Sequence, residues 1–265
     1  MSRRLCLVTG ASSGIGQALG RVFAARGYDL AITARRVDRL QAFADEIRTA
    51  YSVEVLSAPA DLEEPAAVDV ILAEVARQRR VVDALVNNAG YGLPGAYYRT
   101  PWDAQSRFIQ LMVTAPAELT HKTLPGMIER GFGRVLNVAS VAGLTPGSAG
   151  HTLYAAAKSF MIKASESLYL ETRSKGVHVT ALCPGFTRSE FHDANRTREK
   201  MERLPKWMWL TAEEVAEVGY AALDANQPLC VPGRQYKAIA TLARMLPPRA
   251  AIALMARQSR RFRDA

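Results

Sequence analysis

The chain has 265 residues, 49% of them hydrophobic, and a formal net charge of +9. This length and apolar share are enough for one large or two small domains with a sizeable core, and they exclude a disordered or fibrous protein. Eight basic residues against one acid lie between Arg234 and Ala265, so most of the positive charge belongs to the C-terminal tail.

The three cysteines, Cys6, Cys183 and Cys230, lie in separate short apolar runs, a pattern that suits neither a disulfide framework nor zinc ligation. We therefore expect buried thiols in a reducing cytoplasm, and no metal site. The apolar run after the N-terminal arginines is too short for a secretory signal, and no later stretch approaches the length of a membrane span. The sequence thus predicts a soluble, unprocessed, cytoplasmic protein.

Short β-rich apolar runs alternate with longer helical patterns from Leu5 to Gly233. This alternation is typical of a doubly wound α/β Rossmann fold, in which helices flank both faces of a parallel sheet of about seven strands. The predicted strands are Leu5–Thr9, Asp29–Ala34, Val53–Ala58, Ala84–Asn87, Arg134–Ser140, His178–Cys183 and Leu229–Val231. Because neither an internal repeat nor a Pro/Gly-rich linker interrupts the alternation, we predict one domain over residues 1–233.

Two segments depart from this alternation. Residues 186–209 are first charged and then rich in Met and Trp, and we predict that they form a lid beyond the carboxyl ends of the strands, where ligands bind in open α/β sheets. Residues 234–265 are predicted to form a basic helical extension. Two interpretations of this tail stay open: a solvated helix that packs on its own or a neighbouring subunit, and an amphipathic helix that contacts an anionic membrane surface. The rest of the chain is close to charge balance, so we expect no nucleic-acid binding.

A glycine-rich turn follows the first predicted strand and opens a helix. Its sequence is Thr9-Gly10-Ala11-Ser12-Ser13-Gly14-Ile15-Gly16. Glycines permit a tight turn and let backbone N–H groups approach a pyrophosphate, whose charge the helix N-terminus favours. The spacing differs from the general dinucleotide fingerprint, but three glycines with Ser and Thr are more than an ordinary turn requires. The residues expected to bind the cofactor here are Gly10, Ser12, Ser13, Gly14, Ile15 and Gly16.

Arg35 and Arg36 follow the second predicted strand, at the place where NAD sites carry an acidic residue. A cation beside a helix N-terminus opposes the helix dipole, so Arg35 is better explained if an anion binds next to it. The 2′-phosphate of NADP is such an anion and suits a guanidinium fork. The alternative is a pair of solvated surface arginines. We predict NADP(H) as the cofactor.

The next two strand ends supply further candidates for the cofactor site. Asp61 follows the third strand, where it either accepts from the adenine amino group or caps the next helix. The fourth strand ends in Asn87-Asn88-Ala89-Gly90, whose amides are expected to hold the strand ends and the adenosine ribose, although Asn and Gly are also common in turns. The predicted cofactor-binding residues here are Asp61, Leu62, Asn88, Ala89 and Gly90.

Tyr154 and Lys158 are four residues apart in a helical pattern, which places the phenol and the ammonium on one helix face. Together with the glycine-rich turn, Asn87–Gly90, Ser140 and Pro184-Gly185, this pair resembles the short-chain dehydrogenase/reductase family over residues 5–233. The resemblance implies an oxidoreductase that moves a hydride between nicotinamide and a carbonyl or alcohol substrate. It also implies a homodimer or homotetramer.

The same resemblance implies roles for individual residues. Tyr154 would act as the general acid or base on the substrate oxygen, and Lys158 would lower the phenol pKa and bind the nicotinamide ribose. Ser140 would hydrogen-bond the substrate oxygen. The residues expected to hold the nicotinamide carboxamide are Pro184, Gly185, and Thr187 or Ser189. Since one more residue than usual separates Ser140 from Tyr154, we expect an altered substrate-side loop.

Two further features of the sequence bear on the turnover rate and on the class of substrate. Many family members carry an asparagine that holds a water near the active-site lysine, whereas the matching residue here is Met112, which cannot hydrogen-bond a water usefully. A catalytically weak NADP-binding regulatory protein is therefore the alternative to an active enzyme. Trp207, Met208 and Trp209 either form an apolar wall, which favours a hydrophobic ketone or alcohol, or pack the lid on the domain.

Overall fold

Seven parallel strands form the central sheet. The computed structural model describes residues 3–189 and 205–263, with residues 257–263 as backbone only. The strands lie in the order β3-β2-β1-β4-β5-β6-β9, and all neighbouring pairs are parallel. Their bounds are β1 Leu5–Thr9, β2 Asp29–Thr33, β3 Val55–Ser57, β4 Ala84–Asn87, β5 Gly133–Val138, β6 Val177–Leu182 and β9 Leu229–Cys230. The predicted doubly wound Rossmann fold is confirmed, with several strands shorter than expected.

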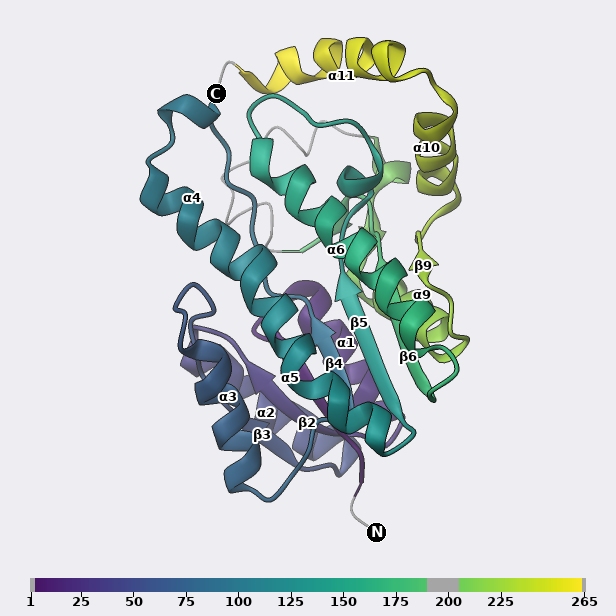
Figure 1. Cartoon of the computed structure of the whole chain (residues 1–265). Coiled ribbons are helices and arrows are strands. Elements are labelled where there is room, and N and C mark those ends of the chain that lie inside the picture. The colour runs from purple at the N-terminus through teal and green to yellow at the C-terminus, as the bar shows by residue number, and fades with distance from the viewer. Residues whose placement is uncertain (1–2, 190–204, 264–265) are drawn as a thin grey trace.

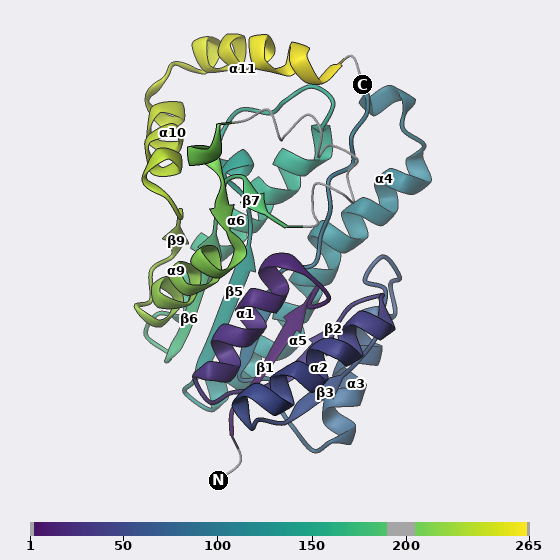
Figure 2. The same cartoon turned by 180° about the vertical axis from the view of Figure 1, so that it is seen from behind.

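Helices cover both faces of this sheet (Figures 1 and 2). One face carries α1 (Gly14–Ala25), α2 (Val37–Tyr51) and α9 (Ala212–Asp224). The other face carries α3 (Ala67–Arg77), α5 (Ala115–Glu129) and α6 (Thr152–Thr172). A further helix, α4 (Trp102–Ile109), continues through the π-helical turn Gln110–Thr114 into α5. Short 3-10 turns occur at Tyr97–Arg99, Val141–Leu144 and Lys206–Met208.

The side chains of β1 show why the strand positions could be predicted from the sequence. Cys6 and Val8 belong to the core beneath α1, α2 and α9, whereas Leu5 and Leu7 belong to the core beneath α3, α5 and α6. Successive side chains of a strand point to opposite faces of the sheet, and here both faces are covered. A strand that is buried on both faces therefore gives a continuous apolar run in the sequence.

The carboxyl ends of the strands lie at one end of the molecule, and the C-terminal helices α10 (Arg234–Met245) and α11 (Pro248–Arg263) cover that end (Figure 1). The short strands β7 (Thr187–Arg188) and β8 (Leu210–Thr211) pair in parallel and connect the segment after β6 to the start of α9. Strand order reverses between β1 and β4, and ligands of open α/β sheets bind outside such a point.

The structure also shows the state of the cysteines, the grouping of potential metal ligands and the polarity of the helices. Cys6, Cys183 and Cys230 are buried free thiols. Within residues 3–189 and 205–263, no three His, Cys, Asp or Glu side chains gather as a metal site. In the same part of the chain, every helix is too short or too polar to cross a bilayer.

Candidate active site

A cavity of about 1660 Å³ opens at the carboxyl ends of the central strands. The residues predicted for the nucleotide and for catalysis line it, except for Gly16. These lining residues are Gly10, Ser12, Ser13, Gly14, Ile15, Arg35, Arg36, Asp61, Leu62, Asn88, Ala89, Gly90, Ser140, Tyr154, Lys158, Pro184, Gly185, Thr187 and Ser189. The fold thus brings together groups that follow six different strands of the sheet.

The turn between β1 and α1 requires its glycines. Gly10 and Gly14 have φ angles of 68° and 56°, in the left-handed region. A Cβ on Gly16 would lie 2.3 Å from the carbonyl oxygen of Gly10, so Gly16 permits close packing of α1 on the turn instead of lining the cavity. The side chain of Ser13 does not cap α1, and the first turn of α1 carries no acid. The N–H groups at the start of α1 therefore suit an anion such as a pyrophosphate.

Arg35 and Arg36 lie on the same wall of the cavity but contact different groups. The guanidinium of Arg36 donates to the hydroxyl oxygens of Ser12 (3.1 Å) and Ser13 (3.0 Å) in the phosphate turn. Arg35 pairs with the carboxylate of Glu63 at 3.1 Å, and its side chain is 58% exposed. Sequence reasoning gave more weight to Arg35, whereas the geometry places the guanidinium of Arg36 against the turn that would hold phosphate.

Asn88 and Asp61 shape the backbone of the cavity. The side-chain amide of Asn88 donates to the carbonyl oxygens of Thr9 (2.9 Å) and Gly10 (3.2 Å), which ties the end of β4 to the phosphate turn. The carboxylate of Asp61 accepts from the backbone N–H of Glu63 at 3.0 Å, and α3 begins only after this turn. Asp61 therefore closes a local turn and does not cap α3.

Tyr154 and Lys158 lie on the cavity side of α6, next to Ser140 after β5. The ammonium of Lys158 lies 5.9 Å from the centroid of the Tyr154 ring and donates to the carbonyl of Val138 at 2.7 Å. The Ser140 side chain interacts with the Tyr154 phenol and favours its ionised form. The Ser140 hydroxyl oxygen also accepts from the N–H of Ala142 at 3.1 Å. Ser140 therefore stabilises the turn after β5 and contacts the phenol as well.

Burial sets the protonation of Tyr154 and Lys158. The Lys158 side chain is 4% exposed, and burial lowers the pKa of its ammonium to about 8. Burial also raises the pKa of the Tyr154 phenol to about 12, although the hydrogen bond to Ser140 acts in the opposite direction. We expected the ammonium to lower the phenol pKa. Among the protein's own groups, however, the cost of removing a phenolate from water is the larger effect.

The segment after β6 crosses the cavity above the phosphate turn. Thr187 is buried, and its hydroxyl donates to the carbonyl of Gly185 at 3.1 Å. Ser189 packs on Gly14, because a Cβ on Gly14 would lie 2.9 Å from the Cβ of Ser189. The contact of this segment with a nicotinamide carboxamide remains a prediction.

Met112 lies in the π-helical turn Gln110–Thr114, and its side chain is 1% exposed. Its sulfur packs on Gly90, where a Cβ would approach the sulfur to 2.6 Å. Such turns within helices are frequent at functional sites. A thioether here packs behind the cavity wall but offers a water no useful hydrogen bond. That Met112 weakens catalysis stays a hypothesis.

The apolar wall differs from the one that we predicted from the lid. Met208 lines the cavity, but Trp207 is 64% exposed and does not line it. The ring of Trp209 packs on Phe186, with the ring centroids 6.0 Å apart. Residues 190–204 of the predicted lid lie outside the described part of the chain.

The C-terminal tail supplies a wall that sequence reasoning missed. Tyr236 of α10 is buried, and its hydroxyl accepts from the N–H of Phe186 at 3.0 Å and donates to the carbonyl of Met208. Its ring packs directly on Gly185, where a Cβ would lie 2.0 Å from the Cζ of Tyr236. The tail residues that line the cavity are Tyr236, Ile239, Leu242, Ala243, Leu246, Ala251, Leu254 and Met255. In the sequence, the helical spacing of these residues was the signal that they share one helix face.

Comparison with known proteins identifies the family. The family model described as short chain dehydrogenase matches residues 4–200. An uncharacterized oxidoreductase of Myxococcus xanthus (strain DK1622) is 39% identical over 201 residues, covering 74% of this chain and 76% of the relative. The NADP-dependent 3-hydroxy acid dehydrogenase YdfG of Salmonella typhi is 33% identical over 219 residues, covering 80% and 86%. The structure of a short-chain dehydrogenase from Sphingobium yanoikuyae in complex with NADPH shares 30% identity at a TM-score of 0.80, covering 91% and 93%. The chain therefore belongs to the short-chain dehydrogenase family and is an oxidoreductase with a nicotinamide cofactor.

Proposed function

We propose that the protein uses NADP(H) to reduce the carbonyl group of a hydrophobic substrate, or to oxidise the corresponding secondary alcohol. The observation that carries this proposal is the convergence of Ser140, Tyr154 and Lys158 in one cavity that also contains a phosphate turn and an arginine-rich end. The NADPH bound to the Sphingobium structure and the NADP-dependence in the name of the Salmonella relative support the choice of cofactor.

The residues present fit this cofactor. The close packing of Gly10 and Gly16 leaves the backbone of the phosphate turn open to a diphosphate, at an α1 N-terminus that the side chain of Ser13 does not cap. Arg36 lies across that turn and suits a 2′-phosphate. When bound, the cofactor supplies or accepts the hydride.

Three side chains would carry the rest of the chemistry. Ser140 and Tyr154 line the same cavity and interact with each other, so both hydroxyls can meet one substrate oxygen and fix its position. In reduction, the Tyr154 hydroxyl donates its proton to that oxygen. The positive charge of Lys158 would stabilise the phenolate left behind. In oxidation, the proton moves from the alcohol to the phenolate.

Steady-state assays of the purified protein test this function. We expect oxidation of NADPH in the presence of hydrophobic ketones or aldehydes, with a lower rate for NADH. The alternative, a regulatory protein that binds NADP and turns over poorly, rests on Met112. Tight NADPH binding without turnover of any carbonyl compound in a broad panel would favour that alternative.

Substitutions of the two arginines test the cofactor choice. We expect Arg36→Ala to weaken NADPH binding by about 10- to 100-fold while NADH binding changes little, because a charge-assisted hydrogen bond contributes about 1.5–3 kcal/mol. Arg35→Ala is expected to have a smaller effect, since Glu63 already offsets its charge. Titration with both nucleotides, followed by their fluorescence, measures this. Equal losses for NADPH and NADH would mean that Arg36 does not contact the 2′-phosphate.

We further propose a homodimer or homotetramer in the cytoplasm. Phe160 and Leu170 of α6 are 44% and 65% exposed, which supports burial of this helix against another subunit. The tail faces the cavity through Leu254 and Met255, so peripheral membrane contact, our other expectation for the tail, would use its remaining face. Light scattering tests the oligomer, and co-sedimentation with anionic vesicles tests the membrane contact.

A further inference from the structure

We propose, building on the function proposed above, that α10 and α11 form the binding wall for an extended, uncharged hydrophobic group of the substrate. The C-terminal tail would then be the element that determines which carbonyl compounds the enzyme accepts. The proposal rests on how charge is distributed in the cavity, on the packing of the two helices and on the size of the cavity.

Charged and apolar residues line different parts of the cavity. Four of the charged side chains that line it follow β2 and β3, at the adenosine end: Arg35, Arg36, Arg39 and Asp61. Lys158 lies beside Tyr154. Among the described lining residues beyond Tyr154, from Thr145 and Pro146 through Phe186 and Met208 to the tail, no side chain carries a charge. A carboxylate or sulfonate would find no counter-ion on this part of the wall, whereas an alkyl group would be well accommodated.

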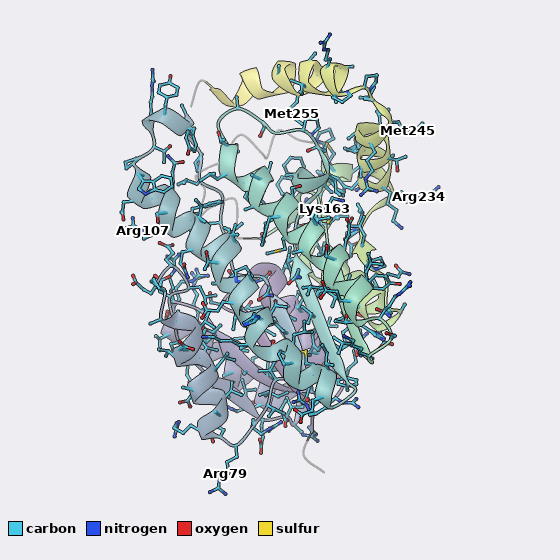
Figure 3. The ribbon with its side chains drawn as sticks, viewed as in Figure 1. Arg79, Arg107, Lys163, Arg234, Met245 and Met255 are labelled. Carbon is cyan, nitrogen blue, oxygen red and sulfur yellow. The ribbon has the colours of Figure 1, made fainter. Side chains whose placement is uncertain are left out.

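The tail presents one continuous apolar face to the cavity. The lining residues Ile239, Leu242 and Ala243 lie on α10 and Leu246 directly follows it, whereas Ala251, Leu254 and Met255 lie on α11. Both sets have the i, i+3, i+4 spacing of a single helix face. Figure 3 shows Met255 on α11, which extends from the end of α10 across the top of the domain. The wall therefore spans two helices, which suits a long group better than a compact one.

The hydrogen bonds of Tyr236 join this wall to the catalytic end of the cavity. Its hydroxyl bonds to the backbone of Phe186 and Met208, and its ring lies on Gly185. Gly185 also belongs to the segment predicted to contact the nicotinamide. A substrate carbonyl at Tyr154 would thus have its hydrophobic group directed along α10 towards α11.

The size and exposure of the wall indicate that a second ligand covers it. A pocket for one ligand measures about 300–1,000 Å³, and this cavity measures about 1660 Å³, enough for a nucleotide and a further molecule. Leu242 and Leu254 line the cavity and are still 56% and 50% exposed. Each methylene of an alkyl group that is buried against such side chains raises the binding affinity of the ligand about fourfold.

The test compares two inner-face variants, Leu254→Asp and Met255→Asp, with the matched control Ile252→Asp. Ile252 lies on the same helix, is 61% exposed and does not line the cavity. The substrates are methyl ketones of increasing length, from butanone to dodecanone, together with oxo acids of the same lengths. For each protein, kcat/KM with NADPH and the Kd of NADPH are measured.

We expect kcat/KM of the natural protein to rise with ketone length, by up to about fourfold per methylene. The two inner-face variants should lose most of this rise, with a much smaller loss for butanone than for dodecanone and with NADPH affinity unchanged, while Ile252→Asp behaves as the natural protein does. The proposal would be overturned if kcat/KM did not depend on chain length, or if the variants lost as much activity with short ketones as with long ones. It would also be overturned if Ile252→Asp had as large an effect as Leu254→Asp, or if the enzyme preferred the oxo acids.

The same experiment separates this inference from the proposed function. If the turnover of short and long ketones alike is insensitive to the tail variants, the proposed function stays intact and the role of the tail is refuted. If no carbonyl compound is reduced, the proposed function fails, and the tail is then tested by calorimetric titration of dodecanol into the protein saturated with NADP. Binding that is lost in Leu254→Asp but kept in Ile252→Asp would still support the wall, and absence of binding to the natural protein would refute it.

Discussion

Replacing Tyr154 by phenylalanine is expected to lower kcat for carbonyl reduction by a factor of about 10²–10⁴, the usual contribution of a positioned general acid. The substitution keeps the ring and removes the hydroxyl that interacts with Ser140. Because the pKa of this phenol is raised to about 12, the proton donor is fully protonated at neutral pH, the form that reduction requires. Steady-state kinetics with NADPH and a hydrophobic ketone measure the effect, and the Kd of NADPH should stay the same.

Tyr91→Phe is the matched control. Tyr91 is a second phenol in the cavity wall, with a pKa that burial also raises, and its ring packs edge-on against Phe108. The charged groups that act on its phenol are Glu63, Arg35 and Arg107 at the nucleotide end, and neither Ser140 nor Lys158 is among them, so we expect no proton transfer from Tyr91. If Tyr91→Phe lost as much turnover as Tyr154→Phe, or if Tyr154→Phe kept full turnover, the assignment of Tyr154 as the general acid would be wrong.

The sheet and the nucleotide end of the cavity could be predicted because local sequence determines them. A strand buried on both faces, such as Leu5–Thr9, leaves an apolar run in the sequence, and positive φ angles leave glycines such as Gly10 and Gly14. The i, i+4 spacing of Tyr154 and Lys158 likewise fixes their common helix face without knowledge of the rest of the fold.

The substrate end depends on contacts between segments that are distant in the chain, and a pattern in one segment does not name its partner. The apolar face of α10 and α11 was visible as a basic amphipathic pattern, but the sequence did not tell whether it faces a membrane, another subunit or a cavity. The decisive contact is Tyr236 on Gly185, 51 positions earlier in the chain. Similarly, two adjacent arginines have the same sequence context, and only the fold distinguishes the partners of Arg36 from those of Arg35.

Lys158→Met is expected to abolish most of the activity and to make the protein more stable at neutral pH. Burial lowers the pKa of Lys158 from its usual 10.5 to about 8, so the charged form is disfavoured in the folded state by an energy on the order of 3 kcal/mol. Methionine has a similar shape and no charge, but it leaves the Val138 carbonyl without its donor, a loss of about 1 kcal/mol. We therefore expect a net gain of about 2 kcal/mol in the free energy of unfolding at pH 7.

The pH dependence of this gain is its sharpest test. Between the folded-state pKa of about 8 and the usual value of 10.5, the unfolded chain binds a proton that the folded protein has lost, so the natural protein becomes more stable as the pH rises through this window. Below pH 8 both states are charged and the whole penalty is present. Urea denaturation should therefore show a large difference between Lys158→Met and the natural protein at pH 7 and a difference of less than about 1 kcal/mol at pH 9.5.

Lys163→Met provides the comparison, because Lys163 lies on the same helix, is 72% exposed and pairs with Glu166 at the surface. Its substitution should change stability by no more than about 0.5 kcal/mol at either pH. A Lys158→Met variant that is less stable than the natural protein at pH 7 would show that the ammonium is well solvated in its cavity. If the predicted gain is found, the protein retains a destabilising charge beside Tyr154, and that cost is explained by the contribution of Lys158 to catalysis.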